Sequence, residues 1–225
     1  WHGNADLIVA IVKLFEDLKN AEHDILGVGV QAILLVEDSV RYYSTYLPEL
    51  YKLVLTQTQT FLTETINEQQ RKIRKRSRPK ILLATNLSDA MAIYQKYKNN
   101  LLGVISDVGF PVHSGDGAEK EKLDAGIDLV RHIRSDDSMM PILLQSSQGS
   151  LISVAQEIGV GFLKKYSKTL MIQLSDYIKE EFGFGDFIFR GADRHEYGRA
   201  SNLTELEALI RTVPDEILLR ATSKN

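Results

Sequence analysis

Five polar side chains that could take part in phosphoryl chemistry stand at or just after short apolar runs. Glu37 and Asp38 follow ILLV, Asp107 follows VIS, Ser146 closes ILLQS and Lys165 closes GFLKK. If each run is a strand of one parallel sheet, these side chains meet at the edge where the strands end. Three carboxylates that lie close together raise one another's pKa unless a cation is present. We therefore expect a cation site at this edge.

The residue types indicate which cation and which reaction to expect. Oxygen ligands without His or Cys favour Mg²⁺ over a transition metal. A carboxylate can also attack phosphorus to give an aspartyl-phosphate, while a metal neutralises the developing charge and a Lys pairs with the new oxygens. Asp107 suits the nucleophile best, and the Ser146 hydroxyl could donate to a phosphoryl oxygen and report the modification by a small movement.

The elements that must position these residues follow from an alternation of apolar runs and amphipathic stretches. This alternation predicts an α/β fold with an open, doubly wound parallel sheet of five strands. Helix patterns begin at Asn86, Ser150 and Ser167, where polar side chains can cap a first turn. The expected strands are Val30–Val36, Lys80–Thr85, Leu101–Ser106, Pro141–Ser146 and Gly161–Lys165.

Two connections depart from a minimal version of this plan. Ser39–Ser77 reads as an extended helical stretch in which Pro48 should cause a kink or start a second helix. Apolar and Gln positions from Leu55 to Ile73 alternate in steps of four and three, so this stretch offers a seam for a homo-oligomer or packs within its own chain. Val112–Leu123 is polar and is expected to be a mobile loop.

The charged-residue counts limit the possible partners. The 225 residues contain 27 Lys+Arg and 30 Asp+Glu, a net charge of -3, which argues against general binding to nucleic acid or to a membrane surface. The basic run Arg71–Lys80 is interpreted first as a solvated helix end and otherwise as a contact for phosphates or an acidic partner. No apolar run reaches the ~20 residues of a membrane helix, and the absence of cysteine fits a cytoplasmic protein.

At the strand ends the sequence resembles the receiver domains of two-component response regulators (CheY-like domains). The resemblance covers about Gln31–Phe182. The matching segments are ILLVEDS, VISDVGFP with Asp107 four residues before Pro111, GIDLVRHIR, PILLQSS and GFLKK.

The resemblance implies a flavodoxin-like fold, phosphorylation of Asp107 by a histidine kinase or another phosphodonor, and a role in phosphorelay signalling. It implies Ser146 as the switch hydroxyl, Lys165 as the cation that pairs with phosphate, and Phe162 as the switch aromatic. The Mg²⁺ ligands that it implies are Glu37, Asp38, Asp107 and the backbone carbonyl of Gly109.

Several positions depart from the family pattern. Ser146 replaces the commoner Thr, and Tyr166 stands where Pro usually follows the Lys. The first helix is extended and the loop after Pro111 is enlarged. The output surface of the domain is therefore expected to differ from that of its relatives.

The flanks extend the resemblance to neighbouring domains. Residues 1–26, which read as a helix or a strand, resemble the C-terminal end of a preceding receiver-like domain, and 27–182 form the receiver-like domain. Residues 183–225 read as a turn-rich linker, a helix near Leu203–Arg211 and the start of a following domain. TVPDEILLRATSKN resembles the lead-in to phosphoenolpyruvate synthase or pyruvate, phosphate dikinase-like proteins of bacteria. We expect the chain to be a piece of a longer polypeptide, with such an enzyme as its output.

Two other functions remain open at this point. A pseudo-receiver would keep the fold and the acidic residues but serve for docking or dimerisation without phosphorylation. A phosphohydrolase with an aspartate nucleophile would share the Asp and Mg²⁺, but it needs a second Asp two residues after the nucleophile as general acid, where this chain has Gly109. We expect no turnover beyond self-phosphorylation and dephosphorylation.

Overall fold

The computed structural model describes residues 5–63, 78–116, 120–191, 193 and 195–222. The chain divides into two compact units, Trp1–Ser175 and Asp176–Asn225. The first unit contains the sheet and every residue proposed for the site.

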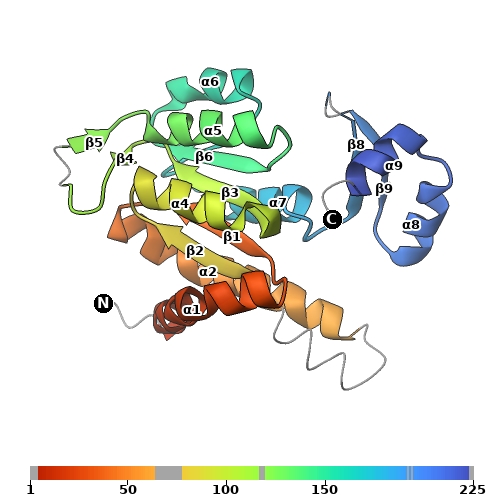
Figure 1. The fold of residues 1–225 in the computed structure, drawn as a ribbon, viewed down its shortest axis with the longest axis horizontal. Helices are drawn as coiled ribbons and strands as arrows, with labels where there is room; N and C mark the ends of the chain where they lie inside the picture. Colours follow the sequence, from red (N-terminus) through yellow and green to blue (C-terminus); the bar gives the residue numbers. More distant parts are fainter. Residues whose placement is uncertain (1–4, 64–77, 117–119, 192, 194, 223–225) are drawn as a thin grey trace. The chain divides into compact units, whose positions relative to one another are not determined.

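A five-stranded sheet forms the centre of the first unit, with the strand order β2-β1-β3-β6-β7 (Figure 1). Every neighbouring pair of these strands is parallel. The predicted doubly wound, flavodoxin-like fold is thus confirmed, and its topological switch point lies between β1 and β3. The strands are β1 (Ala32–Val36), β2 (Lys80–Ala84), β3 (Leu101–Asp107), β6 (Ile142–Ser146) and β7 (Gly161–Lys164).

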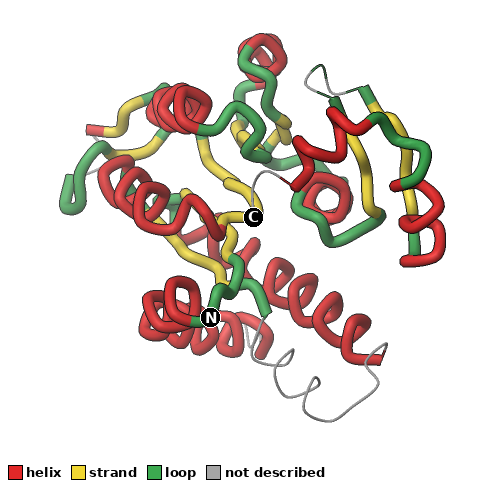
Figure 2. Tube along the Cα trace, turned by 45° about the vertical axis from the view of Figure 1, so that its right-hand side comes forward, coloured by secondary structure: helices red, strands yellow, loops and turns green. Residues whose placement is uncertain are grey.

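Helices cover both faces of the sheet, which explains why the strands are apolar throughout. All five residues of β1 and all five of β6 are buried. Helices α4 (Leu87–Tyr97), α5 (Ala125–Asp136) and α6 (Ile152–Glu157) contribute buried residues to one continuous core with the strands. Helix α2 (Val40–Thr63) lies on the opposite face (Figure 1), and Figure 2 shows the alternation of strands and helices along the chain.

The predicted helix starts are partly confirmed. The Asn86 side chain accepts a hydrogen bond from the Asp89 N–H at 2.9 Å and caps α4. At Ser150 a short 3-10 turn, η4 (Gly149–Leu151), precedes α6. Helix α7 (Leu170–Glu181) begins three residues after Ser167 and runs across the boundary between the two units. A second 3-10 turn, η2 (Lys98–Asn100), leads from α4 into β3.

Helix α2 continues through Pro48, so the predicted second helix does not begin there. Proline removes one backbone donor from the helix, but Leu47 and Leu50 on either side are buried and hold this turn against the sheet unit. The rest of Ser39–Ser77 after Thr63, and with it most of the predicted seam, lies outside the described residues. Oligomerisation through this stretch stays a prediction.

An additional helix, α1 (Ala5–Ala21), packs against α2 and β2. A short π-helix, η1 (Glu22–Gly27), connects it to the sheet. Residues 1–26 were expected to belong to a preceding domain, whereas α1 lies in the same unit as the sheet. The origin of this segment in another receiver-like domain stays a prediction.

A buried charged cluster attaches α1 to the sheet. The Asp17 carboxylate is fully buried and accepts hydrogen bonds from Arg78 at 2.6 and 3.0 Å, from the Tyr51 hydroxyl at 2.9 Å and from the Ile81 N–H at 3.0 Å. Lys80 is buried as well and pairs with Asp24 at 2.6 Å. Reading the basic run as a solvated helix end is therefore wrong for Arg78 and Lys80, because both residues are buried and pair with acidic side chains. The run's residues 71–77 lie outside the described part of the chain.

The segment expected to be a mobile polar loop forms a hairpin at its base. Strands β4 (Phe110–Pro111) and β5 (Glu121–Lys122) pair antiparallel. An ion pair between Lys122 and Asp128 ties the hairpin to α5. The loop thus brings Glu121 back toward the end of β3.

In the second unit, a β-hairpin follows the end of α7, where a linker was expected. Strands β8 (Phe187–Arg190) and β9 (Glu196–Ala200) pair antiparallel, with Phe187 opposite Ala200. The predicted helix near Leu203–Arg211 is confirmed as α8 (Leu203–Ile210), and α9 (Asp215–Thr222) follows. Among the described helices, none is long and apolar enough to cross a bilayer.

Candidate functional site

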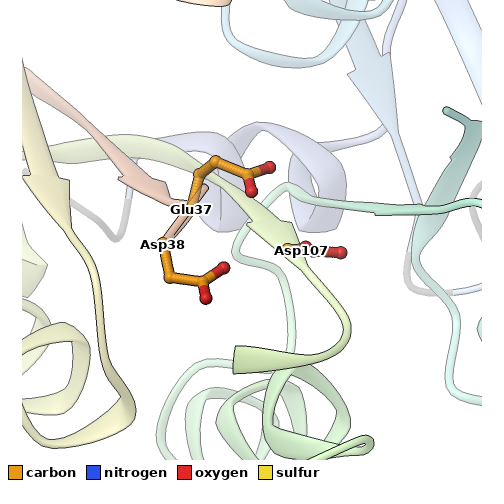
Figure 3. A group of neighbouring side chains, drawn as sticks. All are labelled: Glu37, Asp38 and Asp107. Carbon is orange, nitrogen blue, oxygen red and sulfur yellow. The ribbon is translucent and has the colours of Figure 1, made fainter. Parts of the chain in front are cut away.

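Three carboxylates meet at the carboxyl end of the sheet, next to the switch point. Glu37 and Asp38 follow β1, and Asp107 ends the neighbouring strand β3 (Figure 3). One oxygen from each lies within 4.8 Å of the others. The parallel pairing of β1 with β3, with Val36 opposite Ser106, causes this convergence, because it places both strand ends at the same level. The sequence-based expectation that these residues meet is confirmed.

Lys165, the residue that directly follows β7, completes the cluster. Its ammonium lies 2.6 Å from Asp107 Oδ2 and 2.8 Å from Glu37 Oε2. The Lys165 side chain is only 4% exposed, the Glu37 side chain 1% and that of Asp107 15%. Two carboxylates and one ammonium thus form an ion pair network that is largely shielded from water.

Burial changes the protonation of the two carboxylates. Burial, with the negative charge of Asp107, raises the pKa of Glu37 to about 7 despite the nearby Lys165. Burial also raises the pKa of Asp107, against the opposing effect of Lys165. One ammonium is therefore insufficient compensation for these acids, which is the condition under which a carboxylate cluster accepts a cation.

A pocket of about 300 Å³ opens beside the carboxylates. Ser146 lines it, and its Oγ accepts a hydrogen bond from the Gln148 N–H at 3.2 Å, which leaves the hydroxyl proton available to a ligand. Gly109 lines it too, on the side where the hairpin carries Glu121. The side chains of Asp38, Asp107 and Lys165 also face this pocket.

The donor set fits a hard divalent cation. Glu37, Asp38 and Asp107 offer carboxylate oxygens, and Gly109 lies two residues after Asp107, where its carbonyl can serve as a further oxygen ligand. Among the described residues, these three acids form the one group of at least three His, Cys, Asp or Glu side chains that lie close enough together to hold a metal ion. The chemistry of the donor set is therefore that expected for Mg²⁺.

The backbone around Asp107 is held by a close approach of α5. The Val108 N–H donates to Asp107 Oδ1 at 2.7 Å, and the Gly126 N–H donates to the Val108 carbonyl at 2.8 Å. A Cβ on Gly126 would overlap the Asp107 carbonyl oxygen and lie 2.9 Å from the Val108 Cα. Only glycine lets the helix start this close to the site, a constraint that the sequence analysis did not identify.

Phe162 occupies a different environment from the other expected site residues. It is half-buried on β7 and packs against the core shared with α4, α5 and α6. Among the described residues that line the pocket, Phe162 is absent, whereas Tyr42 and Tyr166 are present. Its role as a switch stays a prediction, and the two tyrosines are site residues that the spacing of the acids did not reveal.

Comparisons with known proteins found distant structural neighbours. No protein-family model and no curated protein matches the chain. A response regulator receiver domain from Clostridium thermocellum is 19% identical, with a TM-score of 0.44, over 68% of this chain and 95% of that one. The non-phosphorylated HemR receiver domain of Leptospira biflexa is 22% identical, with a TM-score of 0.39, over 66% of this chain and 94% of that one.

The phosphorylated cyanobacterial phytochrome response regulator RcpA is 18% identical, with a TM-score of 0.36, over 67% of this chain and 90% of that one. These neighbours are receiver domains or response regulators. The strand order and the acids at the ends of β1 and β3 come from this chain's own structure, which is a doubly wound, flavodoxin-like α/β domain. Any function for this chain has to be argued from its own site.

Proposed function

We propose that the first unit is a phosphoacceptor receiver domain in which Asp107 accepts a phosphoryl group in the presence of Mg²⁺. The observation that carries this proposal is the 2.6 Å contact between Asp107 and Lys165 beside a pocket, with Glu37 and Asp38 in reach of the same ion. A purely structural ion pair needs one acid for one ammonium. Here Glu37 and Asp107 both contact the Lys165 ammonium, and Asp38 is a third acid that could ligate the same metal ion.

The reaction assigned to the site is a phosphoryl transfer. A carboxylate oxygen of Asp107 attacks the phosphorus of the donor, an O–P bond forms, and the bond from phosphorus to the leaving atom breaks. The leaving group keeps that electron pair and takes a proton from solvent. When bound, Mg²⁺ supplies neutralisation of the charge on the phosphoryl oxygens, and Glu37, Asp38, Asp107 and the Gly109 carbonyl would hold it.

The chain's own side chains orient the new group. Lys165 already lies against Asp107, so its ammonium can pair with a phosphoryl oxygen with little movement. The Ser146 hydroxyl, at the end of the next strand, donates to another phosphoryl oxygen, and Phe162 on β7 transmits the change to the domain surface. These assignments rest on the positions of the residues at the strand ends and on the resemblance to receiver domains.

The partners proposed for the domain follow from the same chemistry. The donor is a histidine kinase or another carrier of a reactive phosphoryl group in the cytoplasm. The output is a neighbouring domain of the same chain or a partner enzyme. The resemblance of residues 212–225 to the lead-in of phosphoenolpyruvate synthase-like proteins supports an enzyme that handles phosphoenolpyruvate and pyruvate.

Intact-mass analysis tests the proposal directly. The protein is incubated with MgCl₂ and phosphoramidate, and the gain of one phosphoryl group is followed in time. Asp107→Asn should abolish the gain, and Asp116→Asn, which changes a carboxylate of the hairpin loop, should leave it intact. EDTA should abolish it as well.

A phosphorylated Asp107→Asn variant would remove Asp107 from the mechanism. No adduct on the wild-type protein, with phosphoramidate or with beryllofluoride, would favour the alternative of a pseudo-receiver that serves as a docking module. If no adduct forms, a Mg²⁺ titration shows whether the metal site itself is intact, because a pseudo-receiver that retains its acids still binds the ion.

A further inference from the structure

Tyr42, in the first turn of α2, contacts the site lysine in addition to the two carboxylates. The Lys165 ammonium lies 4.1 Å from the centroid of the Tyr42 ring. A cation this close to an aromatic ring is attracted by the ring's negative face. Tyr42 lines the pocket together with Lys165.

A second tyrosine holds the Tyr42 ring in place. The rings of Tyr42 and Tyr166 lie 5.5 Å apart at an interplanar angle of 69°, an edge-to-face contact. Tyr166 adopts a φ of 67°, which is unusual for a residue other than glycine and costs free energy. This backbone conformation directly follows Lys165 and turns the Tyr166 ring toward Tyr42. The Tyr42 ring also stacks with the ring of the buried Tyr46, with centroids 6.4 Å apart and an interplanar angle of 19°.

The ring differs from the carboxylates as a partner for the ammonium. Glu37 and Asp107 are also the proposed ligands of Mg²⁺, so their attraction for Lys165 weakens when they ligate a cation. An aromatic face offers no lone pair to a hard cation. A metal ion therefore competes with Lys165 for the carboxylates but not for the Tyr42 ring.

We infer that Tyr42 is a positioning residue for phosphoryl transfer. It holds the Lys165 ammonium over the pocket while Glu37 and Asp107 ligate the metal, so that the ammonium is ready to pair with the incoming phosphoryl group. Tyr166 keeps the ring in this orientation. This inference rests on the proposed function and adds a residue outside the strand ends to the site.

The test is a series of substitutions at Tyr42, with the rate of aspartyl-phosphate formation from phosphoramidate and MgCl₂ measured by intact mass. Tyr42→Leu should slow the rate roughly three- to thirty-fold, the factor that corresponds to a cation–π attraction. The rate of Tyr42→Phe should stay within about twofold of the wild-type rate, and Tyr42→Trp should not be slower than the wild type, because the attraction depends on the aromatic ring. Tyr43→Leu, on the adjacent residue of α2, is the matched control.

Two further measurements separate positioning from packing. In a Lys165→Met background, Tyr42→Leu should cause no additional loss. In metal-free protein, Tyr42→Leu should increase the acetylation rate of the Lys165 amine several-fold, as read by peptide mass, whereas Tyr42→Phe should not.

The inference is overturned if Tyr42→Phe is as slow as Tyr42→Leu, if the loss persists without Lys165, or if neither the rate nor the acetylation changes. If the wild-type protein forms no aspartyl-phosphate at all, the proposed function fails instead. The acetylation series still decides whether Tyr42 positions the lysine.

Discussion

Replacing Asp17 by Ala should strongly destabilise the first unit, although Asp17 lies on α1, far from the site in sequence. The substitution leaves the guanidinium of Arg78, a residue that is 5% exposed, without its buried counter-ion. It also removes the acceptor for the Ile81 N–H and the Tyr51 hydroxyl. Breaking a buried charge pair by removing one partner costs about 3–5 kcal/mol. For a unit of this size that corresponds to a fall in Tm of roughly 6–20 °C.

Urea and thermal unfolding, followed by circular dichroism, measure this difference. Glu16→Ala is the matched control, because Glu16 is the adjacent residue, its side chain is 42% exposed, and its carboxylate lies 3.9 Å from the same guanidinium. Solvent screens that pair, so the control should lose less than about 1 kcal/mol. If Asp17→Ala unfolds within about 1 kcal/mol of the wild type, α1 does not stabilise the sheet unit and the reasoning from the buried cluster is refuted.

Two further substitutions test the site itself. Gly126→Ala should lower the free energy of unfolding by about 1–3 kcal/mol and weaken Mg²⁺ binding, because the added methyl group displaces the backbone of Asp107 and Val108. Unchanged unfolding and Mg²⁺ titration curves would contradict the close approach of α5 to this backbone. Burial and Asp107 raise the pKa of Glu37 from 4.5 to about 7, so in EDTA its stabilising contribution is complete below pH 4.5 and is lost as the pH rises through about 7. The free energy of unfolding should fall by about 3 kcal/mol over this pH range. Urea unfolding measured at a series of pH values should show this fall in the wild type and a flatter pH dependence in Glu37→Gln. If the fall persists in Glu37→Gln, another group causes it.

The fold and the acidic centre could be predicted from the sequence because each depends on local patterns. Strands buried on both faces are apolar throughout, as in β1 and β6, and a parallel sheet places the residue after each strand at a common edge. That rule brings Lys165 to Glu37, 128 residues away, without any knowledge of side-chain contacts.

The remaining features depend on contacts that no local pattern encodes. Asp17 meets Arg78 across 61 residues, so a run rich in Arg and Lys looked solvated although two of its side chains are buried. Tyr42 sits on the first turn of an amphipathic helix, where an aromatic residue is ordinarily part of the core. Its position over Lys165 appears only when α2 is packed on the sheet.

The charge of the site connects the proposed divalent cation with the proposed role of the Tyr42 ring. Glu37, Asp38 and Asp107, when ionised, exceed the charge of Lys165 by two, which is the charge that one divalent cation neutralises. Without the ion, burial and the charge of Asp107 raise the pKa of Glu37 to about 7, and protonation of Glu37 removes part of this excess negative charge. A bound divalent cation would neutralise the carboxylates and weaken their attraction for the Lys165 ammonium. A neutral aromatic face attracts the ammonium whether or not the ion is bound, so in the proposed phosphoacceptor Lys165 stays beside the pocket that would receive the phosphoryl group.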